Sequence, residues 1–215
     1  MSDYMNDDDR VQVLRKWWEG NATVLVVTLV VVIAGVIGWR WYGDHTQKRQ
    51  EAASETYQRY LEARQRDASA EEKDALLASL DGEFRGSGYQ IFTLFYRAYD
   101  AVTAKDFPKA TELLETAIKN AKDERLRDIA RLRLARIQLQ AGSADAALET
   151  LRKVSGEGFR AYIAELKGDI LMSQHKPDEA REAYQAAAAA AGPDGPQPVL
   201  DMKIVDLAKP NAPAP

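Results

Sequence analysis

The sequence contains no cysteine and only two histidines, His45 and His175. The absence of cysteine excludes disulfide bonds, thiol catalysis and cysteine metal sites. Neither histidine has a second histidine four residues away, as a helical metal pair requires, and neither has the neighbours of a nucleophile relay. The glycine-containing stretch from Gly82 to Gly88 lacks the Gly-Lys-Ser/Thr ending of a phosphate-binding loop. We therefore expect neither enzyme activity nor a bound cofactor or metal.

The sequence also lacks an excess of basic residues, since 29 Lys and Arg stand against 33 Asp and Glu and the net charge is −4. This balance argues against a general nucleic-acid-binding surface. Five arginines do gather in one segment: Arg125, Arg127, Arg131, Arg133 and Arg136. Acidic residues lie three or four positions from several of them, so local pairing on a solvated helix face is the favoured interpretation. A site for an acidic partner is the alternative.

One long stretch lacks charge altogether. Gly20–Trp39 spans 20 residues, of which 11 are Val, Leu or Ile. A helix of this length is about 30 Å long, which matches the hydrocarbon core of a bilayer. The branched aliphatic side chains favour insertion by about 3–7 kcal/mol. Aromatic residues that suit the headgroup region crowd both ends of the stretch: Trp17, Trp18, Trp39, Trp41 and Tyr42.

Two other interpretations of this stretch are weaker. A buried strand would suit the β-branched residues, but strands run only about 4–8 residues. A cleaved signal peptide would begin with basic residues, whereas Asp3 and the run Asp7–Asp9 precede the stretch, and a small-x-small cleavage site does not follow it. We predict a transmembrane anchor over residues 20–42. Basic residues are nearly balanced on its two sides, so charge bias does not determine its orientation.

The rest of the chain predicts an all-α fold, in which an α-solenoid of tetratricopeptide-like helix pairs follows the N-terminal transmembrane helix. Apolar residues recur at helical spacing, and breaks containing Gly or Pro separate the helical segments. We assign residues 1–19 to a cytoplasmic tail, 20–42 to the anchor, 43–88 to a helical linker and N-terminal helices, 89–191 to the repeats, 192–208 to a C-terminal capping segment and 209–215 to a disordered tail.

Three helix pairs are predicted from Tyr89 onward. The second pair covers Glu124–Ala141 and Ala144–Val154, and the third covers Tyr162–Gln174 and Pro177–Ala191. Five positions of the tetratricopeptide pattern are filled by Ala98, Lys105, Ala110, Leu114 and Ala117 in the first pair, by Ala135, Gly142, Ala147, Leu151 and Val154 in the second, and by Gly168, His175, Ala180, Tyr184 and Ala187 in the third. Small residues are needed because neighbouring helices cross closely. A plain helical bundle with alanine-rich packing is the alternative.

Several motifs carry a more specific resemblance. They are Gln12-Val13-Leu14-Arg15-Lys16-Trp17-Trp18, Gly38-Trp39-Arg40-Trp41, Leu132-Arg133-Leu134-Ala135-Arg136-Ile137-Gln138, Ala147-Leu148-Glu149-Thr150-Leu151, Val154-Ser155-Gly156-Glu157-Gly158-Phe159 and Ala164-Glu165-Leu166-Lys167-Gly168-Asp169. The arrangement resembles the YfgM-type ancillary subunits of the bacterial SecYEG translocon, over the whole chain except the tail after Lys209. Lys105 and His175 depart from the repeat pattern, because glycine is usual at these turns.

The resemblance implies a single-pass protein of the bacterial inner membrane, with its N-terminus in the cytoplasm and its C-terminal domain in the periplasm. It implies as partners the SecYEG translocon, a periplasmic membrane-anchored chaperone, exported client proteins and membrane lipid, but not nucleic acid. The implied function is protein–protein interaction at the translocon, assisting the chaperone with clients. A membrane-tethered assembly or regulatory scaffold for another envelope complex is the alternative.

Two groups of candidate contact residues follow. The inward positions of first repeat helices, carried onto this chain, give a partner groove formed by Phe92, Phe95, Tyr99, Arg136, Gln140, Tyr162, Glu165 and Asp169. Aromatic residues in this set are also suited to core packing. A patch of small residues on the anchor, Ala34, Gly35 and Gly38, could admit a partner membrane helix. Glycine is common in membrane helices, which is the simpler explanation of the patch.

Overall fold

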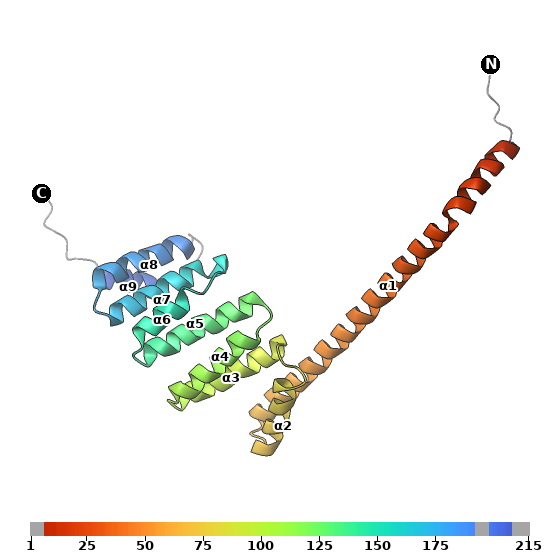
Figure 1. Cartoon of the computed structure of the whole chain (residues 1–215). Coiled ribbons are helices and arrows are strands. Elements are labelled where there is room, and N and C mark those ends of the chain that lie inside the picture. Colours follow the sequence, from red (N-terminus) through yellow and green to blue (C-terminus); the bar gives the residue numbers. More distant parts are fainter. Residues whose placement is uncertain (1–6, 192–197, 208–215) are drawn as a thin grey trace, which may run out of the picture. The chain divides into compact units, whose positions relative to one another are not determined.

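A computed structural model describes residues 7–191 and 198–207, and these ranges contain helices and no strands. The α-helices are α1 (Asp7–Gln65), α2 (Ala70–Asp81), α3 (Gly88–Thr103), α4 (Phe107–Asn120), α5 (Glu124–Gln140), α6 (Ala144–Leu151), α7 (Arg160–Ser173), α8 (Pro177–Ala191) and α9 (Pro198–Asp206). A short 3₁₀ helix, η1 (Glu157–Phe159), precedes α7. The predicted all-α fold is confirmed (Figure 1).

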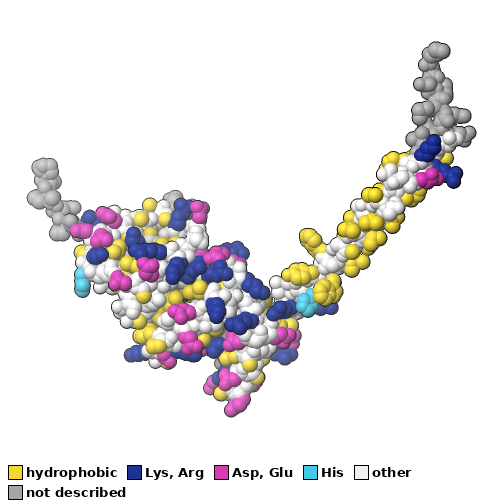
Figure 2. Space-filling model, in the orientation of Figure 1, with side chains coloured by type: hydrophobic (Ala, Val, Ile, Leu, Met, Phe, Trp, Pro, Cys, Tyr) yellow, Lys and Arg dark blue, Asp and Glu magenta, His cyan; other side chains and the backbone are white. Residues whose placement is uncertain are grey.

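The chain divides into two compact units, Met1–Ala52 and Ala53–Pro215. Within the described part of the first unit the chain is one continuous helix, the N-terminal part of α1. Its apolar side chains are exposed along the predicted span, and none of the apolar window is buried against protein (Figure 2). Among the described residues this is the one helix long and apolar enough to cross a membrane. Exposed aliphatic surface of this length is stable in lipid and costly in water.

The second unit stacks three antiparallel helix pairs, α3/α4, α5/α6 and α7/α8, in chain order (Figure 1). The small residues assigned to close crossings are buried, as the repeat register requires: Ala98, Ala110, Ala117, Ala135, Ala147, Gly168, Ala180 and Ala187. Three apolar clusters follow one another along the stack, around Leu114, Leu151 and Tyr184. The apolar face of each helix pair is therefore buried against the element that follows it, as expected of a repeat array.

Side-chain caps begin most of these helices where the sequence has Ser or Asp. The Ser87 hydroxyl accepts a hydrogen bond from the Gln90 amide at 3.2 Å at the start of α3. Asp106 accepts one from the Lys109 amide at 3.0 Å at the start of α4, where Pro108 occupies the first turn. Each cap satisfies an amide that the helix itself leaves without a partner.

The turns within the three pairs share one backbone conformation. Lys105, Gly142 and His175 have φ values of 60°, 81° and 60°, which place all three in the left-handed region. Lys105 and His175 thus retain the turn that glycine usually forms, and both side chains are exposed. A residue with a Cβ atom pays about 1–2 kcal/mol for this conformation.

Lys105→Gly should therefore raise the free energy of unfolding by about 0.5–1 kcal/mol, because relief of the left-handed strain exceeds the extra chain entropy of glycine. Gly142→Ala is the matched control and should destabilise the protein because of its positive φ, although an added Cβ atom would meet no described atom within 4 Å. Thermal and urea unfolding of the full chain in detergent measures both. Equal midpoints for the Lys105→Gly variant and the parent chain would show that the turn stores no strain.

One helix is shorter than its sequence pattern indicates. The second helix of the second pair was predicted to reach Val154, but α6 ends at Leu151. The residues after it leave the helix because the backbone amides of Ser155 and Gly156 bind the Asp128 carboxylate of α5. This contact holds the segment from Val154 to Gly156 against α5, and η1 and α7 follow it.

Candidate functional site

An open hollow of about 550 Å³, the aromatic hollow, lies at the start of the repeat array. Its lining comes from the last turns of α1 (Tyr57, Arg64), from α3 (Phe92, Phe95, Tyr96, Tyr99) and from α5 (Arg133). Tyr99 is 67% exposed, whereas Phe95 is 5% exposed and forms the floor. Aromatic and arginine side chains are the residue types that most often dominate protein-binding energy.

The rings of the aromatic hollow support one another. The Tyr57 ring centroid lies 5.5 Å from that of Tyr89 and 6.2 Å from that of Phe92, and the Phe92 and Phe95 centroids are 6.5 Å apart. Burial, together with the neighbouring Tyr96 hydroxyl, raises the pKa of Tyr57 to about 12. The phenol of Tyr57 is neutral at physiological pH, as an ordinary tyrosine is, so the wall from α1 contributes contact area without negative charge.

Arg64 joins α1 to α3 at the edge of the hollow. Its guanidinium binds both carboxylate oxygens of Asp100, with Nη2 donating to Oδ1 at 2.8 Å. The same guanidinium lies 5.4 Å from the Tyr96 ring centroid and also contacts the Tyr60 ring. A bidentate pair combined with ring stacking holds this wall in place.

The five clustered arginines divide into two groups. Three make local contacts: Arg125 pairs with Asp123, Arg131 pairs with Asp128 and Glu124, and Arg127 pairs with Glu124 and donates to the carbonyls of Ile118 and Ala121 at the end of α4. The other two, Arg133 and Arg136, lie over aromatic faces, 4.3 Å from the Phe95 centroid and 4.8 Å from the Tyr162 centroid. Local pairing thus accounts for three of the five.

Two of the predicted groove residues of the third pair, Glu165 and Asp169, bind a side chain of α9. The Lys203 ammonium donates to Glu165 Oε1 at 2.8 Å and to Asp169 Oδ1 at 2.7 Å. The Tyr184 hydroxyl donates to the same Asp169 oxygen at 2.8 Å. Burial opposes the charge of Lys203, but hydrogen bonds to the two carboxylates outweigh it and hold the pKa of Lys203 above its ordinary value. Both acids are therefore bound within the domain, with one ammonium group shared between two carboxylates.

The structure thus separates the predicted groove into two parts. Phe92, Phe95 and Tyr99 line the aromatic hollow, and Arg136 continues this surface over Tyr162. Gln140 is exposed at the end of α5 and is not among the lining residues. Sequence reasoning missed Tyr57, Arg64 and Lys203. Tyr57 and Arg64 are seven residues apart, which is about two helical turns. This spacing puts both side chains on one face of α1 and is the signal by which they could have been found.

Comparison with known proteins supports the repeat assignment and extends it. A family model described as a tetratricopeptide repeat-like domain matches residues 15–209. The Ancillary SecYEG translocon subunit of Escherichia coli is 30% identical over 209 residues, covering 96% of this chain and 99% of that protein. The proteins of the same name from Haemophilus influenzae and Aggregatibacter actinomycetemcomitans are also 30% identical, over 94% and 87% of this chain and 98% and 91% of their own lengths. The chain belongs to the family of ancillary SecYEG translocon subunits.

This membership agrees with the helical-repeat fold, and with the apolar helix it indicates a membrane-anchored protein. Among the residues described for this ancillary subunit, no group of three or more His, Cys, Asp or Glu side chains could hold a metal ion. The arrangement at the aromatic hollow offers contact area, cations and hydrogen-bonding groups. Such a surface is suited to holding a protein segment.

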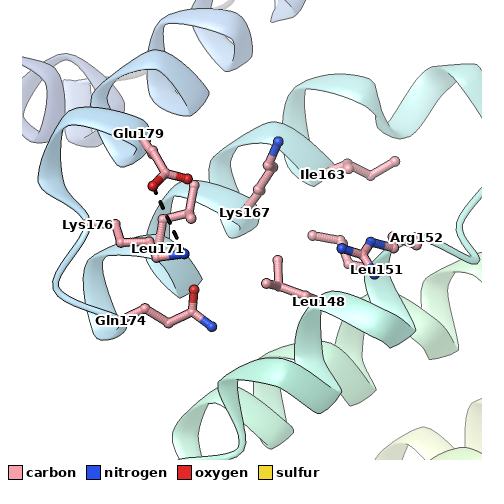
Figure 3. A pocket seen from close by; sticks show the side chains of 9 residues that line it. All are labelled: Leu148, Leu151, Arg152, Ile163, Lys167, Leu171, Gln174, Lys176 and Glu179. Carbon is pink, nitrogen blue, oxygen red and sulfur yellow. Dashed lines mark ion pairs between the residues drawn. The ribbon is translucent and has the colours of Figure 1, made fainter.

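A second hollow, of about 330 Å³, lies between α6 and α7 of this subunit (Figure 3). Leu148, Leu151, Ile163 and Leu171 form its apolar surface, and its polar edge is formed by Arg152, Lys167, Gln174, Lys176 and Glu179. Because an α-helix has 3.6 residues per turn, Ile163, Lys167 and Leu171 lie on the side of α7 away from Tyr162, Glu165 and Asp169. The end of α6 at Leu151 lies at this hollow, and Leu151 and Arg152 are among its lining residues.

In the first unit, Ala34, Gly35 and Gly38 are exposed on α1. A Cβ atom built on either glycine meets no described atom within 4 Å. Larger side chains therefore fit there without disturbing the described structure of this subunit, so substitution at these positions probes contact with another molecule.

Proposed function

We propose that this protein is a single-pass subunit of the bacterial inner membrane that associates with the SecYEG translocon through protein–protein contacts. Its N-terminus lies in the cytoplasm and its repeat domain in the periplasm, where it assists a membrane-anchored chaperone with exported client proteins. The observation that supports this most is the match, over nearly the whole chain, to proteins named as ancillary SecYEG translocon subunits. A tether of this kind raises the local concentration of whatever the repeats bind.

The aromatic hollow and its continuation over Arg136 and Tyr162 form the proposed partner site. This surface combines exposed rings with cations and lies on the first helices of the pairs. Gln140, Glu165 and Asp169 belong to the same side of the array, with Lys203 bound between the two acids. Displacement of Lys203 would be needed before a partner could reach those carboxylates.

Site-specific crosslinking tests the partner site. Because the sequence contains no cysteine, an introduced cysteine is the only thiol that a maleimide can label on this chain. Tyr99→Cys places a thiol on the exposed rim, and Glu115→Cys places one on the exposed face of α4 outside the hollow as a matched control. Carrying a photoactivatable maleimide, the Tyr99→Cys variant should capture translocon subunits or a periplasmic chaperone, and the control should capture several-fold less. Exclusive capture of another envelope assembly would favour the scaffold alternative, and equal capture from both positions would exclude the hollow.

The same variants test the orientation. A membrane-impermeant maleimide should label Tyr99→Cys in cells whose outer membrane has been opened and whose inner membrane is intact. Labelling that appears only after the inner membrane is opened would reverse the proposed topology.

We also propose that the face formed by Ala34, Gly35 and Gly38 docks laterally against a membrane helix of the translocon. Small residues of this kind let two helices approach closely in lipid. Replacement of all three by Leu should leave insertion unchanged but weaken co-purification with translocon subunits in mild detergent. Undiminished association would make the anchor a tether alone and assign the contact to the repeats.

A further inference from the structure

The open part of the proposed partner site carries positive charge that the protein does not neutralise. Arg133 and Arg136 are exposed, and neither forms an ion pair with a carboxylate in the described ranges. Asp100, the carboxylate at the edge of the hollow, is already bound by Arg64. Figure 2 shows Lys and Arg side chains gathered over the middle of the repeat domain, with acidic side chains interspersed.

The other end of the groove is partly covered by α9, where one ammonium group faces two carboxylates. Leu200 of α9 is 1% exposed and packs in the cluster that contains Leu171 and Tyr184. Lys203, one turn further on, binds Glu165 and Asp169 and lies 5.3 Å from the Tyr184 ring centroid. The Lys203 side chain of α9 thus covers part of the first-helix face of the third pair. A partner therefore has open access to α3 and α5, where Arg133 and Arg136 of α5 carry the exposed cations, whereas Lys203 already binds the two acids.

The spacing of the cations and rings defines the ligand further. Arg133 and Arg136 are three residues apart on α5, so both guanidinium groups lie on one face of that helix. Between them and α1 lies the aromatic hollow, whose volume falls within the range of ligand sites. Phe95 at its floor is recessed beneath Arg133, so an apolar group of a ligand would contact the more exposed rings of Phe92, Tyr96 and Tyr99.

We propose that this surface binds an acidic segment of a partner protein, with an aromatic or leucine side chain of the segment inserted in the aromatic hollow and its carboxylates bound by Arg133 and Arg136. The inference rests on the proposed function and specifies the chemistry of its partner. Guanidinium groups bind carboxylates through paired hydrogen bonds, and an adjacent ring adds specificity through burial. A nucleic acid would instead need a continuous track of cations, which a chain of net charge −4 with interspersed acids does not provide.

Peptide binding to the full chain in nanodiscs of neutral lipid tests this. The probes are fluorescein-labelled octapeptides: one with six acidic residues and two phenylalanines, one with serine in place of each phenylalanine, and one with lysine in place of each acid. Fluorescence anisotropy, corrected with empty nanodiscs, should show that the acidic phenylalanine peptide binds at least tenfold more tightly than either of the others. Its affinity should also fall as salt is added.

The variant Arg133→Glu with Arg136→Glu should weaken binding of that peptide at least tenfold and should improve binding of the lysine peptide. Loss of folding cannot produce such a reversal of preference. Arg125→Glu with Arg152→Glu, which changes two arginines that are 83% and 70% exposed outside the hollow, is the charge-matched control and should leave the preference unchanged.

Three results would overturn the inference: equal binding of the serine peptide, tighter binding of the lysine peptide to the parent chain, or undiminished acidic-peptide binding by the Arg133→Glu, Arg136→Glu variant. If crosslinking from Tyr99→Cys still captures translocon subunits in that case, the proposed function stands and the ligand chemistry is wrong. If the peptide preference holds but crosslinking captures another assembly, the ligand chemistry stands and the translocon association is wrong.

Discussion

Asp128→Ala is expected to lower the free energy of unfolding by about 3–5 kcal/mol, the usual effect of removing one member of a buried charged pair. The Asp128 carboxylate is 1% exposed and has hydrogen bonds on both oxygens. Oδ1 accepts from Arg131 at 2.7 Å, and Oδ2 accepts from the backbone amides of Ser155 and Gly156 at 3.2 and 2.9 Å. Alanine would leave these amides without a partner and free the connection that sets the direction of α7. Urea unfolding of the full chain in detergent, followed by circular dichroism, measures the change.

Two further variants separate the buried contact from general effects of charge. Asp128→Asn keeps the size of the side chain and one carbonyl oxygen for the two amides, so it should be less destabilising than alanine. Glu149→Ala removes an exposed carboxylate that pairs with Arg152 and should shift the midpoint little. If Asp128→Ala and Glu149→Ala shift the midpoint equally, the connection does not depend on Asp128.

The Asp128 contact also shows where sequence reasoning reaches its limit. The pairing of Asp128 with Arg131 follows from helical spacing and was predicted. The hydrogen bonds to Ser155 and Gly156 cross 27 and 28 residues, and periodicity carries no information about such contacts. For the same reason the predicted end of the helix at Val154 missed the earlier stop at Leu151.

Features that depend on local pattern were predictable. The charge-free stretch from Gly20 to Trp39 is long enough to determine a helix by itself, and the small residues of the repeats are buried in the predicted register. The turns at Lys105 and His175 were not predictable from residue type, because both residues adopt a conformation that usually favours glycine. There the packing of each pair overrides local preference.

The candidate site was predictable in part. Repeat periodicity places Phe92, Phe95 and Tyr99 on one face of a first helix, and the structure gathers all three in the aromatic hollow. Periodicity could not show that α1 supplies the opposite wall through Tyr57, or that Lys203 of α9 binds Glu165 and Asp169. These contacts join segments that lie outside the three repeat units, so the repeat pattern contains no position for them.

Gly168→Ala is expected to lower the free energy of unfolding by about 2–3 kcal/mol, near the upper end of ordinary overpacking. A Cβ atom at this position would lie 2.4 Å from Cε1 and 2.5 Å from Cδ1 of Tyr184, far inside van der Waals contact. The ring has little freedom to move, because its hydroxyl donates to Asp169 and its body is buried between α7 and α8. The better helix propensity of alanine offsets only about 1 kcal/mol of the cost of this clash.

A double-mutant cycle with Tyr184→Leu isolates this clash. Leucine removes the ring atoms that the new methyl group would meet, so Gly168→Ala should cost much less in the Tyr184→Leu background than in the parent chain. Gly158→Ala is the matched control, since its added Cβ meets no described atom within 4 Å. Thermal unfolding of the variants gives the coupling free energy between positions 168 and 184. Additive effects would mean that α7 and α8 move apart at no cost, and the close crossing that defines the third repeat would then not depend on glycine.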